Sequence, residues 1–269
     1  MMMNKENAKR SWKLELGTGD RVILVLPRMD ADALSREEWL VSLAPYLNDY
    51  TFLILDVPEK LIQEHKGQDT FTVPELAQWA HDYVEKNNIT PYMIWGFSLG
   101  GMMAQYLSTF NEYADTPVLL VSTMLCPNKK LKAVFSTWYM LCDKFGIKGL
   151  QAGLVPWVVK ESELPLFQLE TTDREDEAIA VAKMKAGVQA IINHNGKAYH
   201  EQMKSPIQII FGEESILLGQ EESEYFERYL PQANIDFIQN SGMRMFGEKP
   251  EEVKQVIEKF IDSHFGAEV

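Results

Sequence analysis

The sequence predicts an α/β fold: a mostly parallel, doubly wound sheet with an inserted helical cap. Three observations support this prediction. Short β-branched runs alternate with helical patterns, three of the runs are almost continuously apolar, and one long block contains helical patterns alone. Strand–helix alternation is typical of a parallel sheet with right-handed crossovers. Continuous apolar runs are typical of parallel strands that are covered on both faces.

Seven segments have the length and composition of strands, and five stretches between or after them have helical patterns. The predicted strands are residues 12–16, 21–26, 51–57, 92–97, 118–123, 207–212 and 235–240. The predicted helices are residues 37–47, 74–88, a segment directly after Ser98, 221–230, and 250 to about 264. Ser35 with Glu38, and Thr72 with Glu75, are predicted to form the capping boxes that begin the first two helices.

Residues 127–204 interrupt the alternation of strands and helices. Helical patterns occupy residues 131–145 and 176–199, and no convincing strand lies among them. We therefore expect a core of residues 1–126 and 205–269, with residues 127–204 forming a helical cap over the sheet. Most aromatic and methionine side chains of this block are expected to pack the cap onto the core, and a minority to line a ligand cavity.

Composition and charge narrow the classes of function. The chain has 269 residues and a formal net charge of −13, which argues against a nucleic-acid backbone as the partner. No segment approaches the roughly 18 apolar residues of a membrane span, and the first residues lack the apolar stretch of a secretory signal. We expect a cytoplasmic protein with two buried free thiols, Cys126 and Cys142. The spacing of its residues supports no metal site or phosphate loop, so no cofactor is predicted.

The stretch Gly96-Phe-Ser98-Leu-Gly100-Gly101 follows an apolar run and precedes a helical pattern. A G-x-S-x-G sequence in this context places its serine on a sharp, strained turn, where the glycines avoid Cβ clashes. The hydroxyl then stands at the amino end of the helix, and the amide of Leu99 can donate a hydrogen bond into an oxyanion hole. The motif predicts a nucleophile elbow at Ser98.

At this motif the chain resembles the α/β-hydrolase family, and more narrowly its small capped bacterial members related to proline iminopeptidases and enol-lactone hydrolases. The resemblance covers residues 12 to 266. It depends on GFSLGGMMAQYLS, VLLVST, KSPIQIIFGEES and SGMRMFGEKPEEVKQVIEKF. It implies Ser98 as the nucleophile position and the amides of Leu99 and Met29 as the oxyanion donors. A small-molecule ligand or acyl substrate, a protein partner and a homo-oligomer are all compatible with it.

Three functional positions depart from the family pattern although their surroundings persist. Ser215 stands where the family has its catalytic aspartate, and Met243 stands where it has its histidine. Pro27-Arg28 replaces the His-Gly pair that shapes the family's oxyanion loop. A serine hydroxyl is a poor nucleophile without an adjacent base, and losing the base or nucleophile of such a triad costs on the order of 10⁶ in turnover.

Other side chains were considered as replacements. His194, near the end of the cap, is the best substitute base, and Glu214 is the best substitute acid. His81 and His264 are expected to face outward, and His65 to lie in a polar loop. Several charged residues lie in loops near the carboxyl edge of the sheet, where open α/β sheets bind ligands. A carboxylate there could act as a base and an arginine could bring positive charge near the pocket, but solvated charges are the default expectation for them. They are Arg28, Asp30, Asp32, Asp56 and Arg244.

Two functions remain open from the sequence. The first is a degenerate hydrolase that keeps the fold, elbow and pocket with little or no turnover, and that binds a small ligand or a partner protein. The second is an active serine hydrolase or acyltransferase that uses a rearranged triad on an ester, lactone, thioester or small peptide. The joint change at Ser215 and Met243 favours the first, and the intact glycines around Ser98 favour the second.

Overall fold

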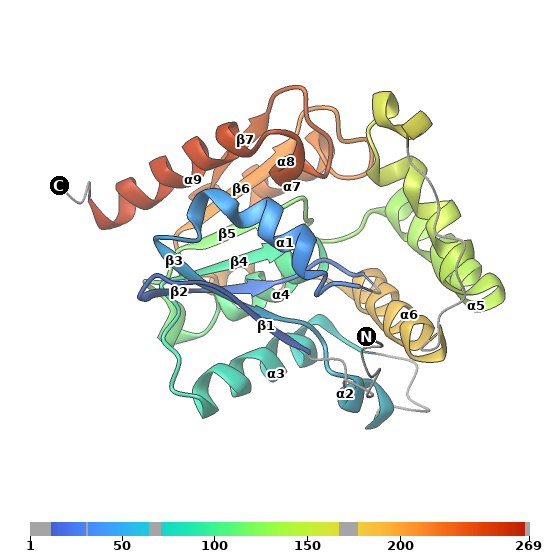
Figure 1. Cartoon of the computed structure of the whole chain (residues 1–269), viewed down its shortest axis with the longest axis horizontal. Helices are drawn as coiled ribbons and strands as arrows, with labels where there is room; N and C mark the ends of the chain where they lie inside the picture. Colours follow the sequence, from blue (N-terminus) through green and yellow to red (C-terminus); the bar gives the residue numbers. More distant parts are fainter. Residues whose placement is uncertain (1–11, 31, 65–70, 167–176, 267–269) are drawn as a thin grey trace, which may run out of the picture.

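The computed structural model describes residues 12–30, 32–64, 71–166 and 177–266. A sheet of seven strands, in the order β1-β3-β2-β4-β5-β6-β7, forms the centre of the molecule (Figure 1). The strands are β1 Lys13–Gly17, β2 Arg21–Leu26, β3 Tyr50–Leu55, β4 Met93–Phe97, β5 Val118–Val121, β6 Ile207–Gly212 and β7 Asn234–Ile238. Each predicted strand is present, with ends that differ by at most two residues. Only the β1–β3 pair is antiparallel, so the prediction of a mostly parallel sheet is confirmed.

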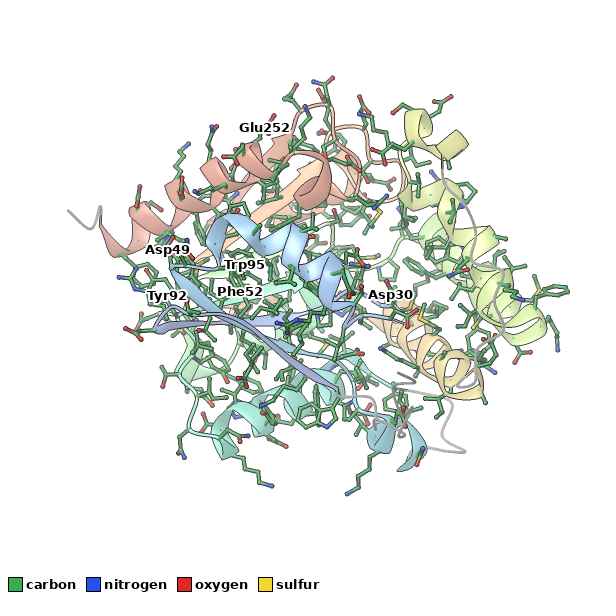
Figure 2. The ribbon with its side chains drawn as sticks, viewed as in Figure 1. Asp30, Asp49, Phe52, Tyr92, Trp95 and Glu252 are labelled. Carbon is green, nitrogen blue, oxygen red and sulfur yellow. The ribbon has the colours of Figure 1, made fainter. Side chains whose placement is uncertain are left out.

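Helices pack on both faces of the sheet. They are α1 Arg36–Leu43, α2 Glu59–Glu64, α3 Val73–Lys86, α4 Leu99–Leu107, α5 Lys129–Val158, α6 Glu177–Asn193, α7 Gln220–Tyr229, α8 Met245–Glu248 and α9 Pro250–Phe265. Successive residues of β2 enter opposite cores. Leu24 belongs to the core that includes residues of α3, α4 and α7, and Val25 belongs to the core that includes residues of α1, α8 and α9. Figure 2 shows Phe52 and Trp95 in the second core, where their ring centroids are 5.3 Å apart. Two buried faces explain why these strands are apolar without alternation.

One of the two predicted capping boxes is confirmed and the other is wrong. Thr72 begins α3 as predicted, because the Glu75 amide donates to its hydroxyl and the Thr72 amide donates to the Glu75 carboxylate at 2.8 Å. The side chain of Ser35 forms no capping hydrogen bond at α1. Glu38 instead accepts two hydrogen bonds from Arg28, at 2.8 and 2.9 Å. Bonds between two charged groups are stronger than a bond to a neutral amide, so Arg28 takes the carboxylate.

Between β5 and β6 the described residues form helices, 3-10 turns and short connecting loops, and they contain no strand, as predicted. After α5 come the 3-10 turns Glu161–Leu166, Gly196–Ala198 and His200–Gln202, with α6 between the first and second. Gly146, with φ of 67°, divides α5 into two helical parts, and the predicted helix also stops at residue 145. Helix α6 packs against α2 and α5 beyond the carboxyl ends of the strands (Figure 1). The division into a core and a cap stays a prediction.

None of the described helices is both long and apolar enough to cross a membrane.

The two cysteines differ in burial. Both are free thiols, but only Cys142 is fully buried. Burial raises the pKa of the Cys142 thiol to about 11. The prediction of a buried Cys126 is wrong because this residue is half-buried at the start of the helical block, near Lys197.

Candidate functional site

Ser98 occupies a strained turn between β4 and α4. Its φ of 51° and ψ of −112° lie in a region that costs a non-glycine residue about 1–3 kcal/mol. Neighbouring strands and turns hold this conformation: the Ser98 amide donates to the Val121 carbonyl at 2.9 Å, and the Thr123 hydroxyl donates to the Ser98 carbonyl at 2.8 Å. The strand–turn–helix geometry expected of the G-x-S-x-G motif is therefore present.

The glycines of this turn are needed for close backbone packing. A Cβ atom on Gly96 would lie 2.5 Å from the Gly100 carbonyl oxygen, and one on Gly100 would lie 2.0 Å from the Leu26 carbonyl oxygen. A Cβ on Gly101 would lie 2.6 Å from the Cβ of Thr123. These contacts are required whether or not the serine reacts. The intact glycines therefore support the turn's geometry and carry no evidence of turnover.

Replacing Gly100 by alanine is expected to lower the free energy of unfolding by about 3 kcal/mol, since overpacking against a backbone that cannot shift is costly. Urea denaturation followed by circular dichroism measures the change. The matched control is Gly247→Ala in α8, where a new Cβ would meet nothing within 4 Å, and it should change stability by less than about 1 kcal/mol. Equal stabilities for the two variants would contradict this account of the turn.

The two predicted oxyanion residues lie close to one cavity. Leu99 is the first residue of α4, so its amide has no partner within the helix and lies at the positive end of the helix dipole. Met29 lies in the loop after β2, and a Cβ on Gly187 of α6 would be 2.8 Å from its Cγ atom. Both residues line the same small cavity. Their role as hydrogen-bond donors to an oxyanion stays a prediction.

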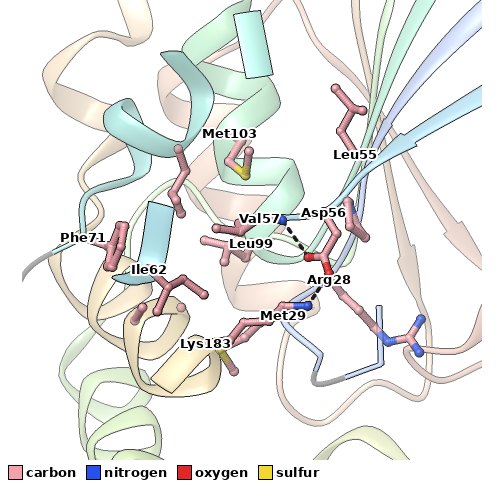
Figure 3. A pocket seen from close by; sticks show the side chains of 14 residues that line it. Arg28, Met29, Leu55, Asp56, Val57, Ile62, Phe71, Leu99, Met103 and Lys183 are labelled. Atoms are coloured by element: carbon pink, nitrogen blue, oxygen red, sulfur yellow. Dashed lines mark hydrogen bonds and ion pairs between the residues drawn. The ribbon is translucent and has the colours of Figure 1, made fainter. Parts of the chain in front are cut away.

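This cavity has a volume of about 30 Å³ and lies between the loops after β2 and β3 and helices α2, α4 and α6 (Figure 3). Its walls are mostly apolar. The lining residues are Pro27, Arg28, Met29, Leu55, Asp56, Val57, Ile62, Phe71, Leu76, Leu99, Met103, Lys183, Ala186 and Gly187. Figure 3 shows the guanidinium of Arg28 directed away from the cavity. It forms ion pairs with Asp30 and Glu38. A space of this size holds a water molecule or two.

A buried ion pair joins α6 to the edge of the sheet inside this cavity. The Lys183 ammonium donates to one carboxylate oxygen of Asp56, and the Val57 amide donates to the other at 2.8 Å (Figure 3). The two side chains are only 15% and 13% exposed. Burial raises the pKa of Asp56 above its ordinary value even though Lys183 lowers it. The expectation of a solvated Asp56 is wrong because α6 covers the edge where this residue lies.

His194 does not reach Ser98. It follows α6 and is 5% exposed, and its Nδ1 atom lies 3.5 Å from the Tyr199 hydroxyl. Its Nε2 atom has no hydrogen-bond partner among the described residues. Burial lowers the pKa of His194 to about 3, so the ring is neutral near pH 7. The structure pairs this histidine with a tyrosine and leaves its proposed role as the base without support.

The remaining histidines contact other groups. His81 lies 3.0 Å from the Tyr113 hydroxyl, and its side chain is only 13% exposed, so the expectation that it faces outward is wrong. The ring is held inward by edge-on packing against Phe110 and Tyr113. His200 contacts the Lys197 carbonyl, and His264 contacts the Phe260 carbonyl. His65 lies outside the described residues. No described histidine forms a hydrogen bond with the Ser98 hydroxyl.

The residues at the two positions predicted for the acid and the base, Ser215 and Met243, lie in adjacent loops after β6 and β7. The Glu214 amide donates to the Ser241 carbonyl at 2.8 Å, which holds the two loops together. Ser215 accepts only a long bond, 3.4 Å, from the Leu218 amide, and Met243 is half-buried against the core. The parallel strands bring both loops to the same edge as Ser98, but position 215 carries no carboxylate and position 243 no imidazole.

Glu214 is engaged in a different interaction. Its carboxylate lies 3.0 Å from the ammonium of Lys160, which also donates to the Asn240 carbonyl at 2.9 Å. Glu248 holds the second loop by accepting from the Ser241 hydroxyl and the Gly242 amide, at 2.9 and 2.7 Å. The proposed substitute acid thus pairs with a lysine from the helical block, and no described histidine is paired with it.

Lys160 and Lys183 are the site residues that sequence reasoning missed. Each lies in the helical block and pairs with a carboxylate that is more than fifty residues away. Surface lysines are common, and no local pattern marks these two. Among the described residues, no group of three histidine, cysteine or acidic side chains has the arrangement of a metal site.

Comparisons with known proteins point to one fold. No protein-family model and no curated protein matches the sequence. Among solved structures, a hydrolase from Pseudomonas aeruginosa is 12% identical, with a TM-score of 0.71 and 93% of each chain covered. An α/β-hydrolase enzyme from a Medee basin deep-sea metagenome library is 15% identical, with a TM-score of 0.72 and 93% of each chain covered.

The enol-lactonase from Burkholderia xenovorans is another similar structure. It is 14% identical, with a TM-score of 0.70, and the match covers 93% of this chain and 95% of that one. The sheet order, the strained serine between β4 and α4, and these likenesses agree with one another. This chain has the α/β-hydrolase fold.

Proposed function

We propose that this chain is an α/β-hydrolase-fold protein that has lost serine-hydrolase turnover and that binds a small ligand or a partner protein. The observation that carries this proposal is the surroundings of Ser98. In the part of the chain that the structure describes, the Ser98 hydroxyl has no histidine as a hydrogen-bond partner, and the four described histidines are engaged elsewhere. Without a base, the hydroxyl keeps its proton and remains a poor nucleophile.

Two further observations support the proposal. The glycines around Ser98 are explained by backbone packing, so they do not argue for retained chemistry. The Asp56–Lys183 pair and the ion pair of Lys160 with Glu214 tie the helical block to the sheet near the site. A small cavity lies beside Leu99, between these paired elements.

The alternative is an active serine hydrolase or acyltransferase with a rearranged triad. The similar structures include an enol-lactonase and an esterase from Thermogutta terrifontis, which make lactones and esters the substrates to test. This alternative requires a base beside Ser98 other than the four histidines that the structure describes. No contact of the described residues favours it over the proposal.

A fluorophosphonate probe separates the two functions. Because the probe reacts with activated serines, we expect the native chain and Ser98→Ala to show the same negligible labelling over an hour. Intact-mass spectrometry measures the adduct, and a working serine hydrolase in the same tube controls for probe quality. Ser215→Ala is the matched serine control. Rapid labelling that disappears in Ser98→Ala and persists in Ser215→Ala would overturn the proposal.

A further inference from the structure

The cavity beside Leu99 combines apolar walls with one buried cation. Apolar surface comes from β3, helices α2, α3 and α4, and the segment just before α3; the residues are Leu55, Ile62, Phe71, Leu76 and Met103. Asp56 and Lys183 are the charged side chains directed into it (Figure 3). An ammonium in apolar surroundings needs an anion beside it, because an unpaired buried charge is very costly. In this structure the anion is supplied by the protein itself.

Asp56 is suited to leave that position. One of its oxygens is held only by the local Val57 amide, and the rest of its stabilisation comes from Lys183. When another anion binds Lys183, the Asp56 carboxyl can be neutralised by taking up a proton, and burial already favours this protonated form. The number of charges in the cavity is then unchanged, since one carboxylate has replaced another.

We propose that this cavity binds small apolar monocarboxylates, with Lys183 as the anion-binding group and Asp56 as the carboxylate that the ligand displaces. The ligand's apolar part lies against Ile62, Phe71 and Met103. The proposal rests on the proposed ligand-binding function and names the ligand class. Because the closed cavity holds only about 30 Å³, binding breaks the Asp56–Lys183 pair and lets α6 move away from the sheet edge.

Because Asp56 takes up a proton when the ligand binds, the affinity for the ligand should depend on pH. Among the described residues, the charged groups that act on Asp56 are Lys183 from α6 and Asp30 from the loop after β2. Arg28 also lines the cavity, but its guanidinium is directed away from it. The cavity-lining residues of α2 and α4 that the structure describes, Ile62, Leu99 and Met103, are apolar. The bound state holds one more proton than the free state, so affinity should rise as pH falls, by up to tenfold per pH unit. Asp56→Asn, which keeps the bond from the Val57 amide but cannot ionise, should bind with little pH dependence.

Titration with hexanoate, followed by isothermal calorimetry and amide NMR shifts, tests the proposal. Hexanamide is the neutral control ligand. We expect the native chain to bind hexanoate at least tenfold more tightly than hexanamide, and Asp56→Asn to bind hexanoate at least tenfold more tightly than the native chain. Lys183→Met should lose hexanoate binding. Lys185→Met is the matched control. Lys185 is on the same helix, pairs with Asp143 and does not line the cavity, so this variant should bind hexanoate as the native chain does.

Each result decides the proposal. Equal affinity for hexanoate and hexanamide, or no hexanoate binding by a folded Asp56→Asn variant, would overturn it. If Lys183→Met does not fold, the two ligands and the pH dependence of the native chain and Asp56→Asn still decide. These outcomes are independent of Ser98 labelling. Loss of hexanoate binding leaves the proposal of lost turnover intact, and rapid Ser98 labelling leaves the carboxylate site intact.

Discussion

The double variant Ser215→Asp with Met243→His is expected to hydrolyse p-nitrophenyl acetate about 10²-fold faster than the native chain. The two positions lie in loops held together by the bond from the Glu214 amide to the Ser241 carbonyl, at the same sheet edge as Ser98. A positioned general base contributes about 10²–10⁴-fold. The lower value is expected because the Pro27-Arg28 loop differs from the family's oxyanion loop. Initial rates at pH 8 measure the effect.

Single variants and a serine knockout control this experiment. Met243→His alone lacks the carboxylate that orients the imidazole, and Ser215→Asp alone lacks the base, so each should gain less than about tenfold. Adding Ser98→Ala to the double variant should return the rate to the native value. A gain that survives Ser98→Ala would mean that the new histidine acts without the elbow. No gain at all would contradict the inference that positions 215 and 243 keep the relay geometry.

The second large effect concerns His194 and the dependence of stability on pH. Burial lowers the pKa of this histidine to about 3 in the folded chain, against about 6.5 when unfolded. Below pH 6.5 the unfolded chain therefore binds a proton that the folded chain does not. Stability is full above pH 6.5 and is lost as pH falls toward 3. The loss from this residue is about 1.4 kcal/mol per pH unit, or about 3 kcal/mol at pH 4.5.

Urea denaturation of the native chain and His194→Gln between pH 7.5 and 4.5 measures this effect. The difference between the two free energies of unfolding should shift by about 3 kcal/mol in favour of the variant as pH falls, because all other titrating groups contribute equally to the stability of both proteins. Tyr199→Phe removes the hydroxyl beside Nδ1 but keeps the histidine in place, so it should retain the native pH slope. Parallel curves for the native chain and His194→Gln would show that this histidine is accessible to protons in the folded state.

Local sequence patterns predicted the elements that depend on nearby residues. The strand RVILVL is apolar after Arg21 because Leu24 and Val25 enter opposite cores, so its residue pattern already indicates that both of its faces are buried. The Thr72 capping box closes within four residues and was predicted correctly. The same pattern at Ser35 failed because Glu38 is taken by Arg28, ten residues earlier along the chain. A capping motif gives the correct structure only where no distant charge competes for its glutamate.

In the candidate site, too, the local features could be predicted and the long-range contacts could not. The turn at Ser98 was predictable because its strain and its close contacts arise from a strand, a turn and a helix that are consecutive in sequence. Whether a base lies beside Ser98 could not be predicted from the sequence, because that depends on which distant side chain the fold brings to the serine. His194 was the best candidate by position along the chain, and the structure turns it toward Tyr199.

By itself, the sequence determined the parallel sheet and the serine turn, and it predicted that Ser215 and Met243 stand at the acid and base positions, because each of these patterns can be recognised in a short stretch of chain. Only the tertiary structure decided that Asp56 is buried against Lys183 and that Glu214 pairs with Lys160. Helix α6 and the short segment after α5 supply the lysines, each more than fifty residues away from its carboxylate in the sequence. The energy of a buried charge depends on what covers it, and that cover exists only once the helical block has packed onto the sheet.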